Sequence, residues 1–214
     1  QVAVLTVVGA FRKGKSFFLS NIVRYLKCRQ GNEEDGSDWM DPNAKVTGFA
    51  WKQSEDSVTE GILIWPEPFF VMNANGEEIA ILLMDTEGAF DHKSTTAQCA
   101  TVFALSALLS SLLVYNVSQD VQEDTLNHLQ VCKQHNNRQK YGLCLIRFQS
   151  LLFLIRDWQN GDEYGFAAGR RLLENKLKNS EGTCGWNSKL TKHFNCRSFP
   201  EMNCALLPHP GNKI

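Results

Sequence analysis

One stretch limits the possible folds more than any other, "VVGAFRKGKSFFL" at residues 7–19. It matches the pattern G-x-x-x-x-G-K-S, in which Gly9 and Gly14 precede Lys15 and Ser16. Such glycines let the backbone curl so that several N–H groups face one anion, and the following helix adds its positive N-terminal end. Since an apolar run precedes the motif and a helical pattern follows it, the stretch predicts a strand, a phosphate-binding loop (P-loop) and a helix. A glycine-rich turn without a ligand is the alternative.

The rest of the chain alternates between apolar runs of strand length and helical patterns. Strands are expected at 1–8, 61–72, 78–88, 112–117, 148–158 and 202–207, and helices at 15–28, 97–111, 118–136 and 167–178. Asn75-Gly76 predicts a hairpin turn between the second and third strands. This alternation predicts an α/β fold with a mostly parallel, mixed sheet covered by helices on both faces.

Composition excludes several classes of protein. The formal net charge of −1 gives no indication of a nucleic-acid partner. The seven cysteines form no Cys-x-x-Cys pair and no zinc-like spacing, which favours reduced thiols over a disulfide framework. The apolar stretch 100–117 is short and rich in Ser and Thr, so we expect a helix and a strand there and no membrane span. Because residue 1 is Gln and a strand begins at once, we expect residues 1–214 to be one incomplete domain of a longer protein.

Two further elements fit a nucleotide site. Asp85 ends the apolar run in "ILLMDTEG", and nucleotide hydrolases place a carboxylate at such a strand end to hold the magnesium shell. Gly88 follows three residues later and can present its N–H to a γ-phosphate. "SEDSVTEGI" supplies Thr59 as a candidate magnesium ligand in a closing loop and Ser57 as a candidate for positioning water. The alternative for these two residues is an ordinary solvated loop.

The P-loop also contains an unexpected arginine. Many small GTPases place a water-orienting Gln directly after the D-x-x-G motif, but this chain has Ala89 there. Arg12 lies within the loop that wraps the phosphates, so we predict that it acts as an arginine finger in cis. The alternative is a solvated charge or a partner of an acidic neighbour.

A third signal concerns the choice of base. The apolar run "LLFLIRDW" ends with Arg156 and Asp157, and a carboxylate at such a place accepts two hydrogen bonds from guanine. The spacing alone is weak evidence, and the usual Asn-Lys-x-Asp motif is absent.

Beyond these single signals, the whole chain resembles the atlastins, dynamin-superfamily GTPases that fuse endoplasmic reticulum membranes. The stretches that match are "GAFRKGKSF", "GFAW", "TEGILIW", "LLMDTEGAFD", "CATVFALSALLSS", "VYNVSQDVQEDTLNHLQ", "FQSLLFLIRDW" and "LLPHPG". The resemblance implies a P-loop GTPase domain. It also implies site residues: Arg12 as the catalytic arginine; Lys13, Gly14, Lys15, Ser16 and Phe17 at the phosphates; Ser16 and Asp85 at Mg²⁺, with Thr59 of the first switch; Glu87 and Gly88 at the nucleotide; and Arg156 with Asp157 at guanine.

The function implied by this resemblance is GTP binding and Mg²⁺-dependent hydrolysis to GDP and phosphate. We expect a homodimer through the nucleotide face, and a cytosolic domain that is joined to the endoplasmic reticulum membrane by a middle helical domain and membrane spans after residue 214. Two alternatives stay open. Glu87 fits a guanylate-binding-protein-like GTPase, whereas Glu60 and the divergent segment 132–147 leave room for a nucleotide-binding paralogue that does not hydrolyse.

Overall fold

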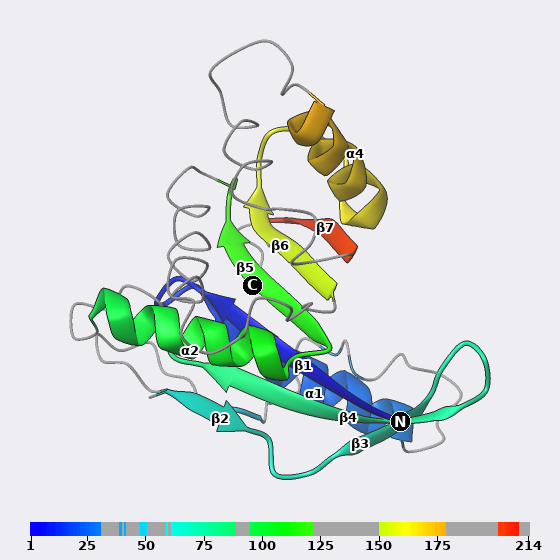
Figure 1. The fold of residues 1–214 in the computed structure, drawn as a ribbon. Coiled ribbons are helices and arrows are strands. Elements are labelled where there is room, and N and C mark those ends of the chain that lie inside the picture. Colours follow the sequence, from blue (N-terminus) through cyan, green and yellow to red (C-terminus); the bar gives the residue numbers. More distant parts are fainter. Residues whose placement is uncertain are drawn as a thin grey trace.

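The computed structural model describes residues 1–30, 39, 41, 48–50, 59, 61–88, 95–121, 150–178 and 201–209. Ten helices and strands lie within these ranges, and Figure 1 shows their arrangement. In chain order they are β1 (Val2–Gly9), α1 (Lys15–Gln30), β2 (Ile62–Ile64), β3 (Phe69–Met72), β4 (Glu78–Thr86), α2 (Thr96–Leu109), β5 (Leu112–Ser118), β6 (Ser150–Trp158), α4 (Gly165–Lys178) and β7 (Glu201–Pro208). The helix expected at 118–136 falls almost entirely outside the described residues.

A single mixed sheet runs through the domain in the order β2-β4-β1-β5-β6-β7, and β3 also pairs with β4. The pairs β1–β4, β1–β5, β5–β6 and β6–β7 are parallel, whereas β2 and β3 run antiparallel to β4. The predicted fold class is therefore confirmed. Because carboxyl ends of parallel strands share one edge, the loops after β1, β4, β5 and β6 meet there.

The expectation of one strand at 61–72 is corrected by the structure, which contains two. Ile64 pairs with Met84, and Phe69 pairs with Ile81. The four residues between Ile64 and Phe69 therefore lie opposite only two residues of β4. The interruption contains Pro66 and Pro68, which lack the N–H that a ladder requires. Both strands therefore share the edge of β4 without continuing into each other.

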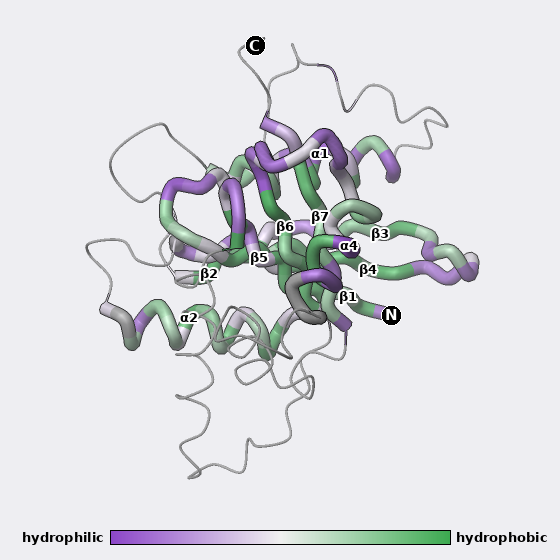
Figure 2. Tube along the Cα trace, turned by 90° about the horizontal axis from the view of Figure 1, so that it is seen from above, coloured by the Kyte–Doolittle hydropathy of each residue, from purple (hydrophilic) through white to green (hydrophobic). Residues whose placement is uncertain are grey.

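The hairpin expected at Asn75-Gly76 is confirmed between β3 and β4. The Asn73 N–H donates to the Glu77 carbonyl at 2.9 Å, and Gly76 has a φ of 78°. Glycine adopts this left-handed conformation without a steric cost, which is why it suits the turn. In Figure 2 this turn is coloured as hydrophilic, while the strands at the centre of the domain are coloured as hydrophobic.

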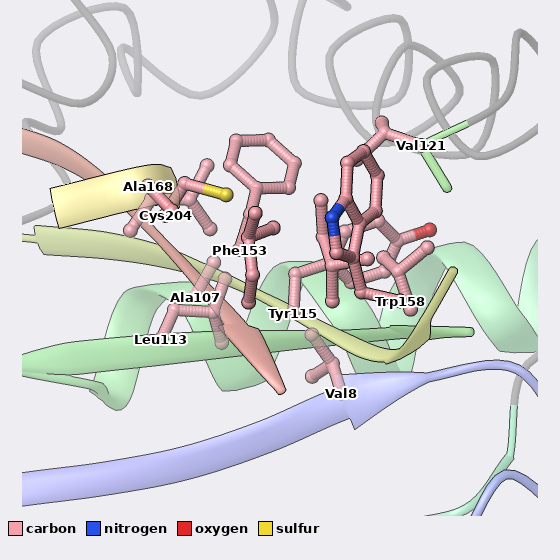
Figure 3. Close-up of a cluster of buried hydrophobic side chains, with 13 residues drawn as sticks. Val8, Ala107, Leu113, Tyr115, Val121, Phe153, Trp158, Ala168 and Cys204 are labelled. Atoms are coloured by element: carbon pink, nitrogen blue, oxygen red, sulfur yellow. The ribbon is translucent and has the colours of Figure 1, made fainter. Parts of the chain in front are cut away.

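Alternate residues of the strands divide the core into two clusters, one on each face of the sheet. Val7, Val114 and Leu154 pack with Leu19 and Val23 of α1. The residues next to them in the strands form the other cluster with α2 and α4, which is seen in Figure 3: Val8, Leu113, Tyr115, Phe153 and Ile155 with Ala107 and Ala168. The helices thus cover both faces, as predicted.

The apolar stretch at 100–117 forms the end of α2 and most of β5, as expected from the sequence. Thr95 caps α2 because its side chain accepts a hydrogen bond from the Gln98 N–H, and the Gln98 side-chain oxygen accepts the Thr95 N–H in turn. None of the helices in the described part of the chain combines the length and the apolar character needed to cross a bilayer.

Candidate nucleotide-binding site

The P-loop connects the end of β1 at Gly9 to the start of α1 at Lys15. A side chain on Gly9 would place its Cβ 2.4 Å from the backbone oxygen of Asn116, so only glycine fits there. Gly14 has a φ of 69°, and its carbonyl accepts the Phe18 N–H at 2.9 Å. The two glycines therefore allow the tight approach and the left-handed turn that the motif predicted.

Lys15 is buried at the foot of this loop, with only 6% of its surface exposed. Its Nζ donates to the Ala10 carbonyl at 3.2 Å. Burial lowers the pKa of Lys15 from 10.5 to about 8, although the negative charges of Asp85 and Glu87 act in the opposite direction. Among the described residues, only the Ala10 carbonyl accepts a hydrogen bond from this cation, which suits a lysine that binds phosphate.

Ser16, Asp85 and Thr59 meet beside Lys15. The hydroxyls of Ser16 and Thr59 both donate to Asp85 Oδ2, at 2.5 Å and 2.9 Å, and they lie 3.4 Å from each other. Burial raises the pKa of Asp85, which is fully inaccessible, while the two hydroxyl donors oppose that rise. Residues far apart in the sequence, and predicted from it to share one metal, therefore form one cluster.

The second carboxylate oxygen of Asp85 shows that this cluster fits Mg²⁺. Asp85 Oδ1 is buried and accepts no hydrogen bond from any residue that the structure describes. Mg²⁺ is usually held by one or two carboxylates, hydroxyls and substrate phosphates, so an uncompensated carboxylate oxygen beside two hydroxyls is a suitable donor set. The described residues contain no group of three or more His, Cys, Asp or Glu side chains that could hold a metal ion.

The segment after Asp85 lies against the P-loop. A Cβ on Gly88 would come within 2.4 Å of the Phe11 Cα, so this glycine brings the two loops into contact. Glu87 binds the segment after Thr59 twice: its N–H donates to the Gly61 carbonyl at 2.7 Å, and its Oε2 accepts the Gly61 N–H at 3.0 Å. Glu87 thereby joins the segment after Asp85 to the segment after Thr59.

Three predicted phosphate or catalytic residues in the P-loop and the first turn of α1 are exposed to solvent. The side chains of Arg12, Lys13 and Phe17 are all exposed. Arg12 has a φ of 57°, a conformation that non-glycine residues seldom adopt. The roles of these residues stay predictions, and Ser57 lies outside the described residues.

The structure brings Arg156 into contact with the P-loop, which the sequence did not indicate. Its Nε donates to Asn116 Oδ1 at 2.8 Å, and its Nη2 donates to the Lys13 carbonyl. Asp157 has a φ of 59° at a register irregularity in β6, and its Oδ2 accepts the Ser118 hydroxyl at 3.1 Å. Neither arrangement tests the predicted contact with guanine.

Sequence reasoning missed two residues of this region, Asn116 and Ser118. Both are polar positions in the otherwise apolar run "LLVYNVS". A polar residue that interrupts a buried strand at its carboxyl end is a signal that could have identified them, because buried polar groups need partners.

Comparisons with known proteins agree with this geometry. A family model described as "Guanylate-binding protein, N-terminal domain" matches residues 1–214. The relatives include Atlastin-1 of Bos taurus and Atlastin-2 of Homo sapiens, each 42% identical over the whole of this chain. Atlastin-3 of Rattus norvegicus is also 42% identical. The chain spans 38%, 36% and 40% of the lengths of these three proteins, respectively.

Proposed function

The chain belongs to the guanylate-binding protein family of GTPase domains and has the atlastins among its relatives, and on this basis we propose that it binds GTP with Mg²⁺ and hydrolyses GTP to GDP and phosphate. The resemblance to the atlastins that the motifs indicated is confirmed. The hydrolysis and the role of Mg²⁺ are proposals that rest on the arrangement of the site.

The observation that supports this function best is the cluster of Ser16, Thr59 and Asp85 next to a buried Lys15. With a pKa of about 8, Lys15 is mostly protonated at neutral pH and can neutralise the β- and γ-phosphates of the nucleotide. Asp85 Oδ1 and the Ser16 hydroxyl would hold Mg²⁺, and Thr59 would join them. Mg²⁺ held by these residues would offset the negative charge of the nucleotide phosphates.

Hydrolysis requires a group that stabilises the charge of the transition state. Water attacks the γ-phosphorus, the bond to the β–γ bridging oxygen breaks, and GDP leaves. Ala89 has no side chain that could orient this water, whereas Arg12 is exposed in the middle of the P-loop. We assign the cis arginine finger to Arg12 and a water-positioning role to Ser57. We also assign to Gly88, which lies against Phe11, the donation of its N–H to the γ-phosphate.

Base recognition completes the proposed site. We assign guanine recognition to Asp157, whose carboxylate lies at the carboxyl end of β6 and is held by the Ser118 hydroxyl. From the resemblance to the atlastins we also propose that the domain dimerises through its nucleotide face. Segments outside this chain would then anchor it on the cytosolic side of the endoplasmic reticulum membrane, where it would act in membrane fusion.

Single-turnover GTP hydrolysis with wild type and Arg12→Ala tests the proposal. We expect the variant to bind GTP nearly as well as wild type, because Lys15 and the loop N–H groups still hold the phosphates. Its turnover should fall by roughly 10²-fold or more, about 3 kcal/mol in transition-state stabilisation. Arg29→Ala is the matched control, since it removes an exposed arginine about 20 Å along α1.

The same assay carries three further readouts. Chelation of Mg²⁺ should stop turnover, and the wild-type rate per molecule should rise with protein concentration if the domains dimerise. An Arg12→Ala variant that hydrolyses GTP at the wild-type rate would remove the finger role. Wild type that binds GTP without releasing phosphate would identify the non-hydrolysing paralogue instead.

A further inference from the structure

We propose that Asn116 is a positioning residue of the nucleotide site, which together with Arg156 holds the P-loop by the Lys13 carbonyl. Affinity for the phosphates, and not the choice of base, would then depend on this pair. The inference rests on the proposed function, because it describes how the site for GTP is kept in shape.

Three hydrogen bonds close a ring between two strands and the P-loop. Asn116 Nδ2 donates to the Lys13 carbonyl at 2.8 Å, and Asn116 Oδ1 accepts Arg156 Nε at 2.8 Å. Arg156 Nη2 donates to the same carbonyl. Asn116 is only 2% exposed, so its amide cannot exchange these partners for water without a rearrangement.

Each P-loop glycine lies close to one of these two residues, Asn116 or Arg156. Gly9 is in register with Asn116, and a Cβ there would be 2.4 Å from the Asn116 backbone oxygen. A Cβ on Gly14 would lie 3.2 Å from Arg156 Nη1. The start and the end of the phosphate loop thus lie against the same two residues; the contact with the Asn116 backbone requires glycine at position 9, while the positive φ favours it at position 14.

The ring directs the Arg156 guanidinium toward the phosphate side of the site. A guanidinium has a fixed fork of donors, and two of them, Nε and Nη2, are engaged by Asn116 and Lys13. The base side is left to Asp157, which the Ser118 hydroxyl holds. Asn116 and Ser118 are two residues apart on β5, so one strand end supports the two halves of the site separately.

Equilibrium titration with GTP and with inosine triphosphate (ITP) tests this division, because ITP lacks the exocyclic amine of guanine. Asn116→Ala should weaken the binding of both nucleotides by the same factor, about tenfold or more, since it leaves Arg156 Nε and the Lys13 carbonyl short of partners. The GTP-to-ITP ratio of dissociation constants should stay at the wild-type value. Ser118→Ala is the matched variant on the same strand, and it should instead raise that ratio toward one, because discrimination against ITP is lost.

A double-mutant cycle with Arg156→Ala adds a second criterion. If the two side chains act as one support, Asn116→Ala, Arg156→Ala and the double variant should lose similar factors in affinity. Additive losses would overturn the inference, as would an altered GTP-to-ITP ratio in Asn116→Ala. Circular dichroism and thermal unfolding establish that each variant is folded at the temperature of titration.

Two outcomes separate this inference from the function on which it rests. Wild type that binds neither nucleotide would contradict the proposed function itself. Wild type that binds GTP, together with an Asn116→Ala variant that binds it within twofold of wild type, would contradict the inference alone. Should Asn116→Ala fail to fold, Arg156→Lys answers the same question, because a Lys keeps the charge but cannot complete the ring. A changed nucleotide ratio in that variant would show that Arg156 contacts the base.

Discussion

Replacing Lys15 with Met should make the nucleotide-free domain more stable while it removes GTP binding. Lys15 is buried, and Ala10 accepts its single described hydrogen bond. Since the pKa falls from 10.5 to about 8 and each pKa unit corresponds to about 1.4 kcal/mol, the buried charge costs about 3 kcal/mol below pH 8. Losing the bond to Ala10 offsets about 1 kcal/mol of that. We therefore expect Lys15→Met to gain about 2 kcal/mol in free energy of unfolding near neutral pH.

The destabilisation caused by the buried Lys15 charge should disappear as the pH rises through a defined interval. The folded protein loses the Lys15 proton at a pKa of about 8, whereas the unfolded chain keeps it up to about 10.5. Between these values the unfolded state binds more protons, so the free energy of unfolding rises with pH. Integrated from about pH 7.5 to about pH 9.5, the rise for wild type is about 2 kcal/mol. Lys15→Met should lack this rise.

Urea unfolding of the nucleotide-free protein, followed by tryptophan fluorescence at both pH values, measures the effect. Lys13→Met serves as the control, because it removes an exposed lysine from the same loop. Its free energy of unfolding should rise with pH as that of wild type does. If the free energies of unfolding of Lys15→Met and wild type change in parallel over this pH interval, Lys15 is not held as a buried charge and the reasoning is wrong. Calorimetric titration should detect no GTP binding to Lys15→Met.

Three other changes have outcomes that follow from single contacts. Asp157→Asn should lose its preference for GTP over xanthosine triphosphate in a competition assay, because an amide cannot accept both guanine donors; a retained preference would show that Asp157 does not contact the base. Gly88→Ala should weaken GTP binding about tenfold or more by displacing Phe11, and unchanged affinity would contradict this. Gly169→Ala should lower the free energy of unfolding by about 2 kcal/mol, since its Cβ would lie 2.2 Å from the Cys204 carbonyl; equal denaturation midpoints would refute it.

Much of the fold could be predicted because its signals are local. The apolar runs of β1, β5 and β6 and the motif at Gly9 to Ser16 each specify a strand or a turn within a few residues. The boundary inside 61–72 was missed, although Pro66 and Pro68 were visible, because the length of a run was given more weight than its missing N–H donors.

The sequence by itself determined which chemical groups the site contains. Lys15 and Ser16 are placed by the turn they belong to, and Asp85 is placed by the end of an apolar run, so spacing alone predicted a phosphate cradle with a carboxylate near it. The structure then brought the hydroxyls of Ser16 and Thr59 to the same oxygen of Asp85.

Only the tertiary structure decided what supports this cradle. Asn116 and Arg156 are 103 and 143 positions from the Lys13 carbonyl that both contact, and no local pattern relates them to it. Their contacts exist because β1, β5 and β6 are parallel neighbours in one particular register. A shift of one residue would turn each side chain to the other face of the sheet, so the partner of a buried polar group is fixed by strand pairing and not by its own sequence.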